Sequence, residues 1–204
     1  MSTVVAPLAY TGSIGLWAFM TTAQTLIIEQ HDYYQKQTFR NRTHIHGANG
    51  KLMLSIPVKH LGIIGRQYYH TVEIENSFTW QKQHWKSIQS AYRSSPYFEF
   101  YEDNLAILYK TDFSSLYTFN KACFELLLKL LGWEPTIQYT ESYENTPAAR
   151  DIRTQIEQKK STHDVALRYT QVFEDKNGFI PNLSIIDLLF NEGPNALTLL
   201  KARV

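Results

Sequence analysis

The sequence predicts an α/β fold with a mixed sheet, made of a parallel βαβ core, an antiparallel hairpin and packed helices, with a tendency toward three layers. Two β-branched, apolar stretches, Thr3–Leu8 and Thr25–Glu29, enclose a short apolar helix pattern, and a strand–helix–strand unit of this length is right-handed and parallel. An Asn-Gly turn at residues 49–50 separates two further strand patterns, which is typical of a hairpin.

The first half of the chain supplies the βαβ unit and the hairpin. The strand–helix–strand unit turns at Thr11-Gly12-Ser13, before the short helix pattern. The hairpin strands run from Thr43 to His46 and from Leu52 to Val58, and we expect them to be added to the parallel core. The loop Lys59–Arg66 has two glycines whose backbone N–H groups could cradle an anion, although a flexible hairpin loop explains the same residues.

The stretch from Val72 to Phe98 is the most distinctive in the chain. A short alternating strand at Val72 and Ile74 runs into Asn76, and a helix follows. Ser94-Ser95-Pro96 ends that helix, because proline disfavours helical geometry in the preceding residue and cannot donate the next hydrogen bond. Helical spacing gives this helix one aromatic, apolar face and one basic face. The faces are formed by Trp80, His84, Trp85, Ile88, Ala91 and Tyr92, and by Lys82, Lys86, Gln89 and Arg93.

The second half alternates helices, strands and one polar segment. Gly132 stands where the left-handed cap of a long core helix belongs. The polar segment 142–164 is interpreted as an exposed linker with one marginal helical turn. The other expected elements are helices at 96–109 and 112–131, strands at 135–140 and 166–173, and a helix within 179–191.

Composition narrows the class of protein. The 204 residues fit a single domain over residues 1–204, with 44% hydrophobic and 19% charged residues. A net charge of +1 gives no general attraction to nucleic acid, so no nucleic-acid partner is expected. The single cysteine, Cys123, excludes an internal disulfide and a thiolate metal cluster, and no metal site is expected. We find neither a signal peptide nor a membrane-spanning apolar run, and we expect a soluble, cytoplasmic protein.

Two groups of candidate ligand-binding residues precede the hairpin. His31 and Asp32 follow the second strand at its carboxyl end, where open α/β sheets place ligands. Arg40 and Arg42 would lie on one side of an extended chain, with Asn41 on the other, and two guanidinium groups can clamp a phosphate or carboxylate. Surface arginines paired with acidic neighbours are the alternative.

Further candidates lie on the helices. His84 could act as a general base or hydrogen-bond a sugar, or it could be a neutral core histidine. Trp80 could stack on a sugar or base, or pack in the core. Asn76 and Asn182 could bind substrate, although each also fits a helix cap. Asp187 is a candidate catalytic carboxylate or a residue of the helix's polar face.

Three stretches together resemble the WbqC-like proteins of bacteria, a family named for a member encoded with O-antigen biosynthesis genes. The order and spacing of these stretches agree from roughly Tyr10 to Pro194. The stretches are Arg40-Asn41-Arg42, then Val72–Asn76 with Trp80, His84-Trp85-Lys86 and Tyr92 through Pro96-Tyr97-Phe98, and finally Phe179–Asn191 with Gly193-Pro194.

The resemblance implies a role in surface polysaccharide assembly, with acyl or aminoacyl transfer on an amino sugar suggested by analogy. A nucleotide- or lipid-linked sugar would then be the partner. The chain departs from the family pattern in two places. Ala6, Pro7 and Leu8 stand where the family has His-Gln-Pro, and the Gly-Gly-Lys-x-Tyr-Leu segment of longer members is missing. If those elements carry ATP chemistry in longer relatives, this chain has lost it.

Two hypotheses follow. The first is a WbqC-like transferase in which Arg40 and Arg42 hold an anion and His84, Asn182 and Asp187 surround the reacting group. It predicts a cleft where Asn41, Asn76, His84 and Asn182 converge. The second is a catalytically degenerate relative that binds a ligand or a protein. The sequence specifies neither a cofactor nor an oligomeric state.

Overall fold

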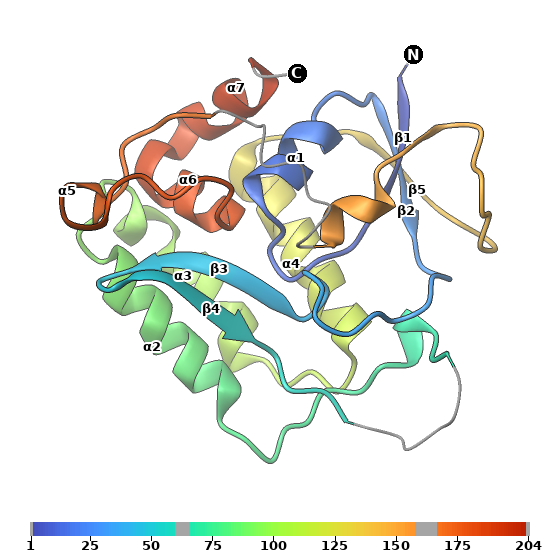
Figure 1. The fold of residues 1–204 in the computed structure, drawn as a ribbon, viewed down its shortest axis with the longest axis horizontal. Helices are drawn as coiled ribbons and strands as arrows, with labels where there is room; N and C mark the ends of the chain where they lie inside the picture. Colours follow the sequence, from blue (N-terminus) through green and yellow to red (C-terminus); the bar gives the residue numbers. More distant parts are fainter. Residues whose placement is uncertain (1, 60–65, 158–166, 203–204) are drawn as a thin grey trace.

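The fold is built around a four-stranded parallel sheet (Figure 1). The structure is a computed structural model that describes residues 2–59, 66–157 and 167–202. The strand order is β5-β2-β1-β6, and every neighbouring pair is parallel. The chain places β2 and β5 on one side of β1 and β6 on the other, so the strand order reverses between β1 and β6. The strands are β1 (Thr3–Pro7), β2 (Thr25–Glu29), β5 (Thr136–Tyr139) and β6 (Arg150–Asp151).

Two helices provide the connections within this sheet. α1 (Ile14–Met20) joins β1 to β2, and α4 (Leu116–Leu131) leads into β5. Trp17 of α1 stacks on Phe124 of α4 with 5.6 Å between ring centroids, so the two helices share one apolar cluster with the inward-facing sheet residues. Figure 1 shows the connection from β5 to β6 swinging out on the other side of β1 from α1. The predicted α/β class and parallel βαβ core are confirmed.

The predicted hairpin is also confirmed, as β3 (Arg42–Gly47) and β4 (Gly50–Ser55). It forms a sheet of its own instead of joining the parallel core, which corrects our expectation. The reason is that other groups occupy the outer edge of β3. The His44 carbonyl accepts the Ser184 backbone N–H at 2.8 Å, and the His46 backbone N–H donates to the Tyr92 hydroxyl at 3.2 Å.

The amphipathic helix is α2 (Trp80–Tyr92), and its predicted inner face is buried, with Trp85 half-buried at its border. α3 (Phe98–Lys110) follows it. Asn76 does not cap α2. Its side chain accepts a hydrogen bond from the Trp80 indole and donates one to the Phe113 carbonyl, while Thr79 occupies the cap position. The expected strand at Val72 and Ile74 is reduced to isolated bridges at Glu73 and Ile74, which follow the 3-10 helix η1 (Tyr69–Thr71).

The described part of the polar segment is more ordered than we expected of a linker. It contributes β6, which pairs with β1, and the 3-10 helix η2 (Arg153–Ile156). Ile152, Arg153 and Ile156 are buried, although their neighbours in the sequence are mostly polar. Residues 158–164 of the segment lie outside the described residues, as do residues 60–65 of the glycine-containing loop.

The expected strand at 166–173 is wrong over its described residues, 167–173. These residues carry no ladder pairing because Tyr169 and Gln171 turn their side chains to the buried carboxylate of Asp187. The chain closes with α5 (Glu174–Asn177), α6 (Ile185–Glu192), η3 (Gly193–Asn195) and α7 (Ala196–Lys201).

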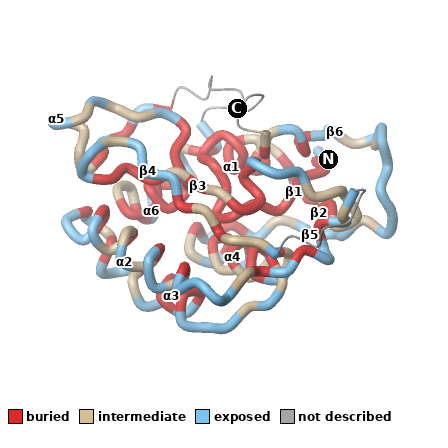
Figure 2. Tube along the Cα trace, turned by 60° about the horizontal axis from the view of Figure 1, so that its bottom comes forward, coloured by how far each residue is buried: buried red, intermediate tan, exposed pale blue. Residues whose placement is uncertain are grey.

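The buried residues follow β1, β2, β3 and α6, whereas β4, β5, β6 and the outer faces of α2 and α3 are largely exposed (Figure 2). Among the helices of the described ranges, none has both the length and the apolar character needed to cross a bilayer.

Candidate functional site

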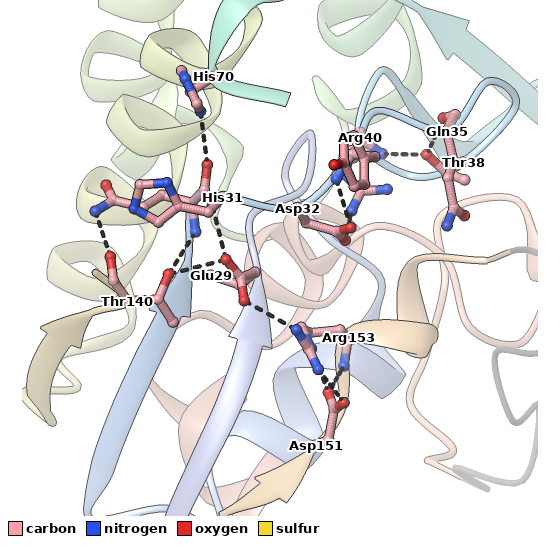
Figure 3. A network of polar contacts seen from close by, with 12 residues as sticks. Glu29, His31, Asp32, Gln35, Thr38, Arg40, His70, Thr140, Asp151 and Arg153 are labelled. Carbon is pink, nitrogen blue, oxygen red and sulfur yellow. Dashed lines mark hydrogen bonds and ion pairs between the residues drawn. The ribbon is translucent and has the colours of Figure 1, made fainter. Parts of the chain in front are cut away.

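The carboxyl ends of the parallel strands carry a network of polar side chains (Figure 3). Glu29 ends β2 and is 2% exposed. Its Oε1 accepts hydrogen bonds from the His31 backbone N–H at 2.7 Å and from the Thr140 hydroxyl at 2.9 Å. Open α/β sheets bind ligands at this edge, so the network lies where a site is expected.

One guanidinium group is shared by two carboxylates at this edge. Arg153 is 6% exposed and donates to Glu29 Oε2 at 3.0 Å, and to the two oxygens of Asp151 at 2.9 and 2.8 Å. Partial burial raises the pKa of Asp151, but the hydrogen bonds and charge of Arg153 outweigh that effect, so the pKa is lowered. Asp151 is therefore ionised, and its bidentate contact orients the Arg153 guanidinium. The separate contact of Arg153 with Glu29 links the end of β6 to the end of β2, across β1.

His31, Asp32 and Arg40 lie at the same edge. The buried Arg40 guanidinium forms an ion pair with Asp32 and lies 5.2 Å from the centroid of the Tyr69 ring. Arg40 Nε and Nη1 have no hydrogen-bond partner in the described part of the chain. The His31 ring lies edge-on to His70, with 5.9 Å between centroids.

Arg40 and Arg42 do not form the two-armed clamp that strand alternation suggested. β3 begins at Arg42, so Arg40 precedes the strand and the alternation of side chains does not extend to it. Arg40 points to Asp32, whereas Arg42 lines a cavity beside the hairpin. The half-buried hydroxyl of Tyr34 is influenced by both: burial raises its pKa, and the charges of Arg42 and Arg40 oppose that rise.

A second candidate region lies beside the hairpin. Two cavities, of about 510 and about 430 Å³, share the lining residues Ser55, Pro57 and Phe78. We call the two cavities together the hairpin groove. Phe78 is 63% exposed at their junction, and an exposed aromatic ring beside a cavity can stack on the apolar face of a sugar or a base.

The larger cavity of the hairpin groove is basic. Three cationic side chains, Lys36, Arg42 and Lys59, line it together with one carboxylate, Glu75. Lys59 has an exposed ion pair with Glu73, whereas Arg42 has no hydrogen-bond or ion-pair partner among the described residues. The carboxamide of Asn41 also lines this cavity and is 7% exposed; its nitrogen donates to the Ile56 carbonyl at 3.0 Å, and its oxygen is unpaired within the described ranges.

The smaller cavity carries the predicted helix residues Trp80 and His84. His84 is 6% exposed, and its Nδ1 lies 2.9 Å from the Tyr10 hydroxyl. Burial lowers the pKa of His84 to about 4, and a hydrogen bond to the Ser55 backbone opposes that shift. The ring is therefore neutral at pH 7, and its polar atoms are engaged with protein groups.

Asn182 and Asp187 lie elsewhere. Asn182 has a left-handed backbone (φ 53°), and its side-chain oxygen accepts the Gly15 backbone N–H at 2.8 Å, at the start of α1. Asp187 is fully buried and accepts hydrogen bonds from the hydroxyls of Tyr92 and Tyr169. Burial raises the pKa of Asp187, and those hydrogen bonds oppose the rise. Neither residue lines the hairpin groove, so the expected cleft of Asn41, Asn76, His84 and Asn182 is not formed as a unit.

Sequence reasoning did not select Glu29, Thr140 or Arg153. Glu29 and Thr140 end two predicted strands, so the argument that selected His31 applies to them as well. Arg153 gave no such signal because it lies in the polar segment. In the part of the chain that the structure describes, no group of three or more potential ligands could hold a metal ion.

The comparison with protein families decides the identity of the chain. The sequence model of the WbqC-like protein family matches residues 9–165 and 154–199. The chain belongs to the WbqC-like protein family. Both the arginine-containing segment before the hairpin and the stretch around α2 lie inside the matched residues, which confirms the resemblance seen in the sequence.

One relative of this WbqC-like protein aligns over nearly its whole length. It is the uncharacterized protein Rv1507c of Mycobacterium tuberculosis, 24% identical over 209 residues that cover 89% of this chain and 90% of the relative. No solved structure matches the chain.

Proposed function

We propose that this WbqC-like protein binds an anionic sugar derivative, a nucleotide- or lipid-linked sugar, in the hairpin groove, and that it serves O-antigen-type surface polysaccharide biosynthesis in the cytoplasm. The observation that carries the proposal is the guanidinium of Arg42, which lines a ligand-sized cavity and has no hydrogen-bond or ion-pair partner among the residues that the structure describes. A half-buried guanidinium group without a counter-ion favours binding of a phosphate or carboxylate.

The rest of the hairpin groove supports a sugar-bearing anion over a bare one. Lys36 and Lys59 add positive charge around Arg42, so the larger cavity suits a phosphate group. The Phe78 ring stands at the junction, and Trp80 and Gln83 line the smaller cavity. Aromatic rings with a few polar groups are the usual lining of carbohydrate and nucleotide sites.

Ligand binding is better supported than acyl or aminoacyl transfer. A general base needs a pKa near the working pH and a free nitrogen directed at the substrate. His84 has a pKa lowered to about 4 and contacts Tyr10 and the Ser55 backbone. The transferase remains the second candidate, because His84 lines the same cavity as Trp80.

Thermal unfolding with nucleotides and nucleotide sugars tests the proposal. A ligand at about one hundred times its Kd stabilises the native state by about 2.7 kcal/mol. We expect Arg42→Gln to weaken binding about tenfold or more, because a charge-assisted contact is lost. Arg93→Gln, on the exposed end of α2, makes the same charge change away from the groove and should bind like the unmodified protein.

Two results would count against the proposal: equal stabilisation of the Arg42→Gln variant, or no stabilisation by any nucleotide sugar. Turnover assays on the same ligands separate the two candidates. Conversion of a nucleotide sugar that is lost in His84→Gln, with folding and binding retained, would favour the transferase over the binding protein.

A further inference from the structure

The outward face of α3 carries two large apolar side chains that water can reach. Phe100 is 72% exposed and Ile107 is 60% exposed. They are seven residues apart, so they project from the same side of the helix, about two turns from each other. Figure 2 shows α3 at the outside of the fold, with exposed residues along its outward side. Single exposed apolar residues are common, but two in line on one helix form a stripe that can pack against a second helix.

Two charges of opposite sign lie beside this stripe. Glu99, in the first turn of α3, and Lys110, in its last turn, are both exposed. They are eleven residues apart, which is close to three full turns, so they lie along one line of the helix. Neither side chain has a hydrogen-bond or ion-pair partner among the residues that the structure describes. The outward side of α3 therefore has an acidic end, an apolar middle and a basic end.

These four positions are complementary to themselves when two copies of α3 pack in opposite directions. A two-fold axis then places each residue opposite the residue at the mirrored position of the other copy. The midpoint of Phe100 and Ile107 lies between residues 103 and 104, and the midpoint of Glu99 and Lys110 lies between residues 104 and 105. The two midpoints differ by one residue, about 1.5 Å along the helix. One axis therefore satisfies both the apolar pair and the charged pair.

We propose that this protein forms a symmetric dimer through α3, and that a second copy of the chain covers the exposed face. Phe100 of each copy packs on Ile107 of the other at the centre of the interface. Glu99 of each copy pairs with Lys110 of the other at its rim. The interface uses one helix of each copy and is small, so we expect a weak dimer, with a Kd on the order of 100 µM.

Sedimentation equilibrium of the full chain, at concentrations from about one tenth to ten times the expected Kd, tests the proposal. We expect an equilibrium between monomer and dimer. Phe100→Ser should weaken the dimer at least about tenfold, because it removes the larger apolar side chain from both copies. Asp103 is exposed and lies beside the axis, close to its own copy, so Asp103→Asn should tighten the dimer severalfold by removing a repulsion between carboxylates.

An exchange of charges tests the antiparallel register. Glu99→Lys and Lys110→Glu should each weaken the dimer about tenfold, because each change places like charges together twice in the dimer. The Glu99→Lys/Lys110→Glu double variant restores opposite charges across the interface and should dimerise about as tightly as the unmodified chain. These changes oppose the helix dipole of α3 and lower stability slightly, so circular dichroism first establishes that each variant is folded. Glu134→Lys makes the same charge change at an exposed position outside α3 and should leave the Kd unchanged.

Three results would overturn the proposal. They are a chain that stays monomeric throughout the concentration range, a dimer that persists unchanged in Phe100→Ser, and a double charge variant that dimerises no more tightly than the single variants. Arg42→Gln should leave dimerisation intact, because the α3 interface is separate from the hairpin groove.

Discussion

Replacing Arg153 by methionine removes the guanidinium group that Glu29 and Asp151 share while keeping most of the side-chain volume. The carboxylate of Glu29 is 2% exposed, so hydration replaces its lost partner only in part. Removing one partner of a buried ion pair costs about 3 to 5 kcal/mol. Glu29 keeps two hydrogen bonds, from the His31 N–H and the Thr140 hydroxyl, so we expect a loss near the lower end, about 3 kcal/mol.

Urea unfolding followed by circular dichroism measures this loss, and thermal unfolding should show a midpoint lowered by about 6 to 12 °C. The Glu29→Gln/Arg153→Met double variant removes both charges and should recover about 1 to 2 kcal/mol. Arg150→Met, at an exposed position in β6, should cost less than about 1 kcal/mol. If Arg153→Met is as mild as Arg150→Met, or if the double variant recovers nothing, the buried-charge reasoning is wrong.

Three other predictions concern buried titratable groups. The pKa of His84 is about 4 in the native state and 6.5 in the unfolded chain, so the unfolded chain takes up protons first as the pH falls. The contribution of His84 to the free energy of unfolding should be fully present above about pH 6.5 and should fall by up to about 3 kcal/mol toward pH 4. Urea titrations of His84→Gln should show a shallower decline with pH, and an equal slope would refute this account. Asp187→Ala leaves the hydroxyls of Tyr92 and Tyr169 without their acceptor, so it should lower the free energy of unfolding by about 3 kcal/mol. A loss below about 1 kcal/mol would show that these hydroxyls find other partners. Burial raises the pKa of the Cys123 thiol, so a thiol reagent should label Cys123 in urea and leave the native protein unlabelled over the same time; rapid native labelling would contradict its burial.

The sequence predicted those parts of the fold that depend on local pattern. Strand–helix–strand spacing was sufficient for β1, α1 and β2, and Asn49-Gly50 was sufficient for the hairpin. Helical spacing identified the buried face of α2, including His84. Each of these features is determined by residues near in sequence.

The predictions that were wrong concern segments whose structure depends on a partner elsewhere in the chain. β6 has two residues and is a strand only because β1 accepts it at the edge of the sheet. Residues 167–173 have a strand-like composition, but Tyr169 is held by Asp187. The same distinction holds for the candidate site. The position of His31 and Asp32 at the end of a strand was sufficient to predict them, whereas the place of Arg153 in the site depends on the pairing of β6 with β1.

The outer edge of β3 has a consequence for how the protein is made. Its His44 carbonyl is satisfied by the backbone N–H of Ser184, which is separated from it by most of the chain, and the Thr11 hydroxyl bridges the hydroxyls of Thr43 and Ser184 at 2.9 and 2.7 Å. On the ribosome, the hairpin therefore emerges long before the residue that closes its edge. An open strand edge is a template for pairing with another chain. A nascent or truncated chain that stops before Ser184 would leave the His44 carbonyl on the outer edge of β3 unpaired and open to pairing with another chain. This edge is covered only when translation has reached Ser184.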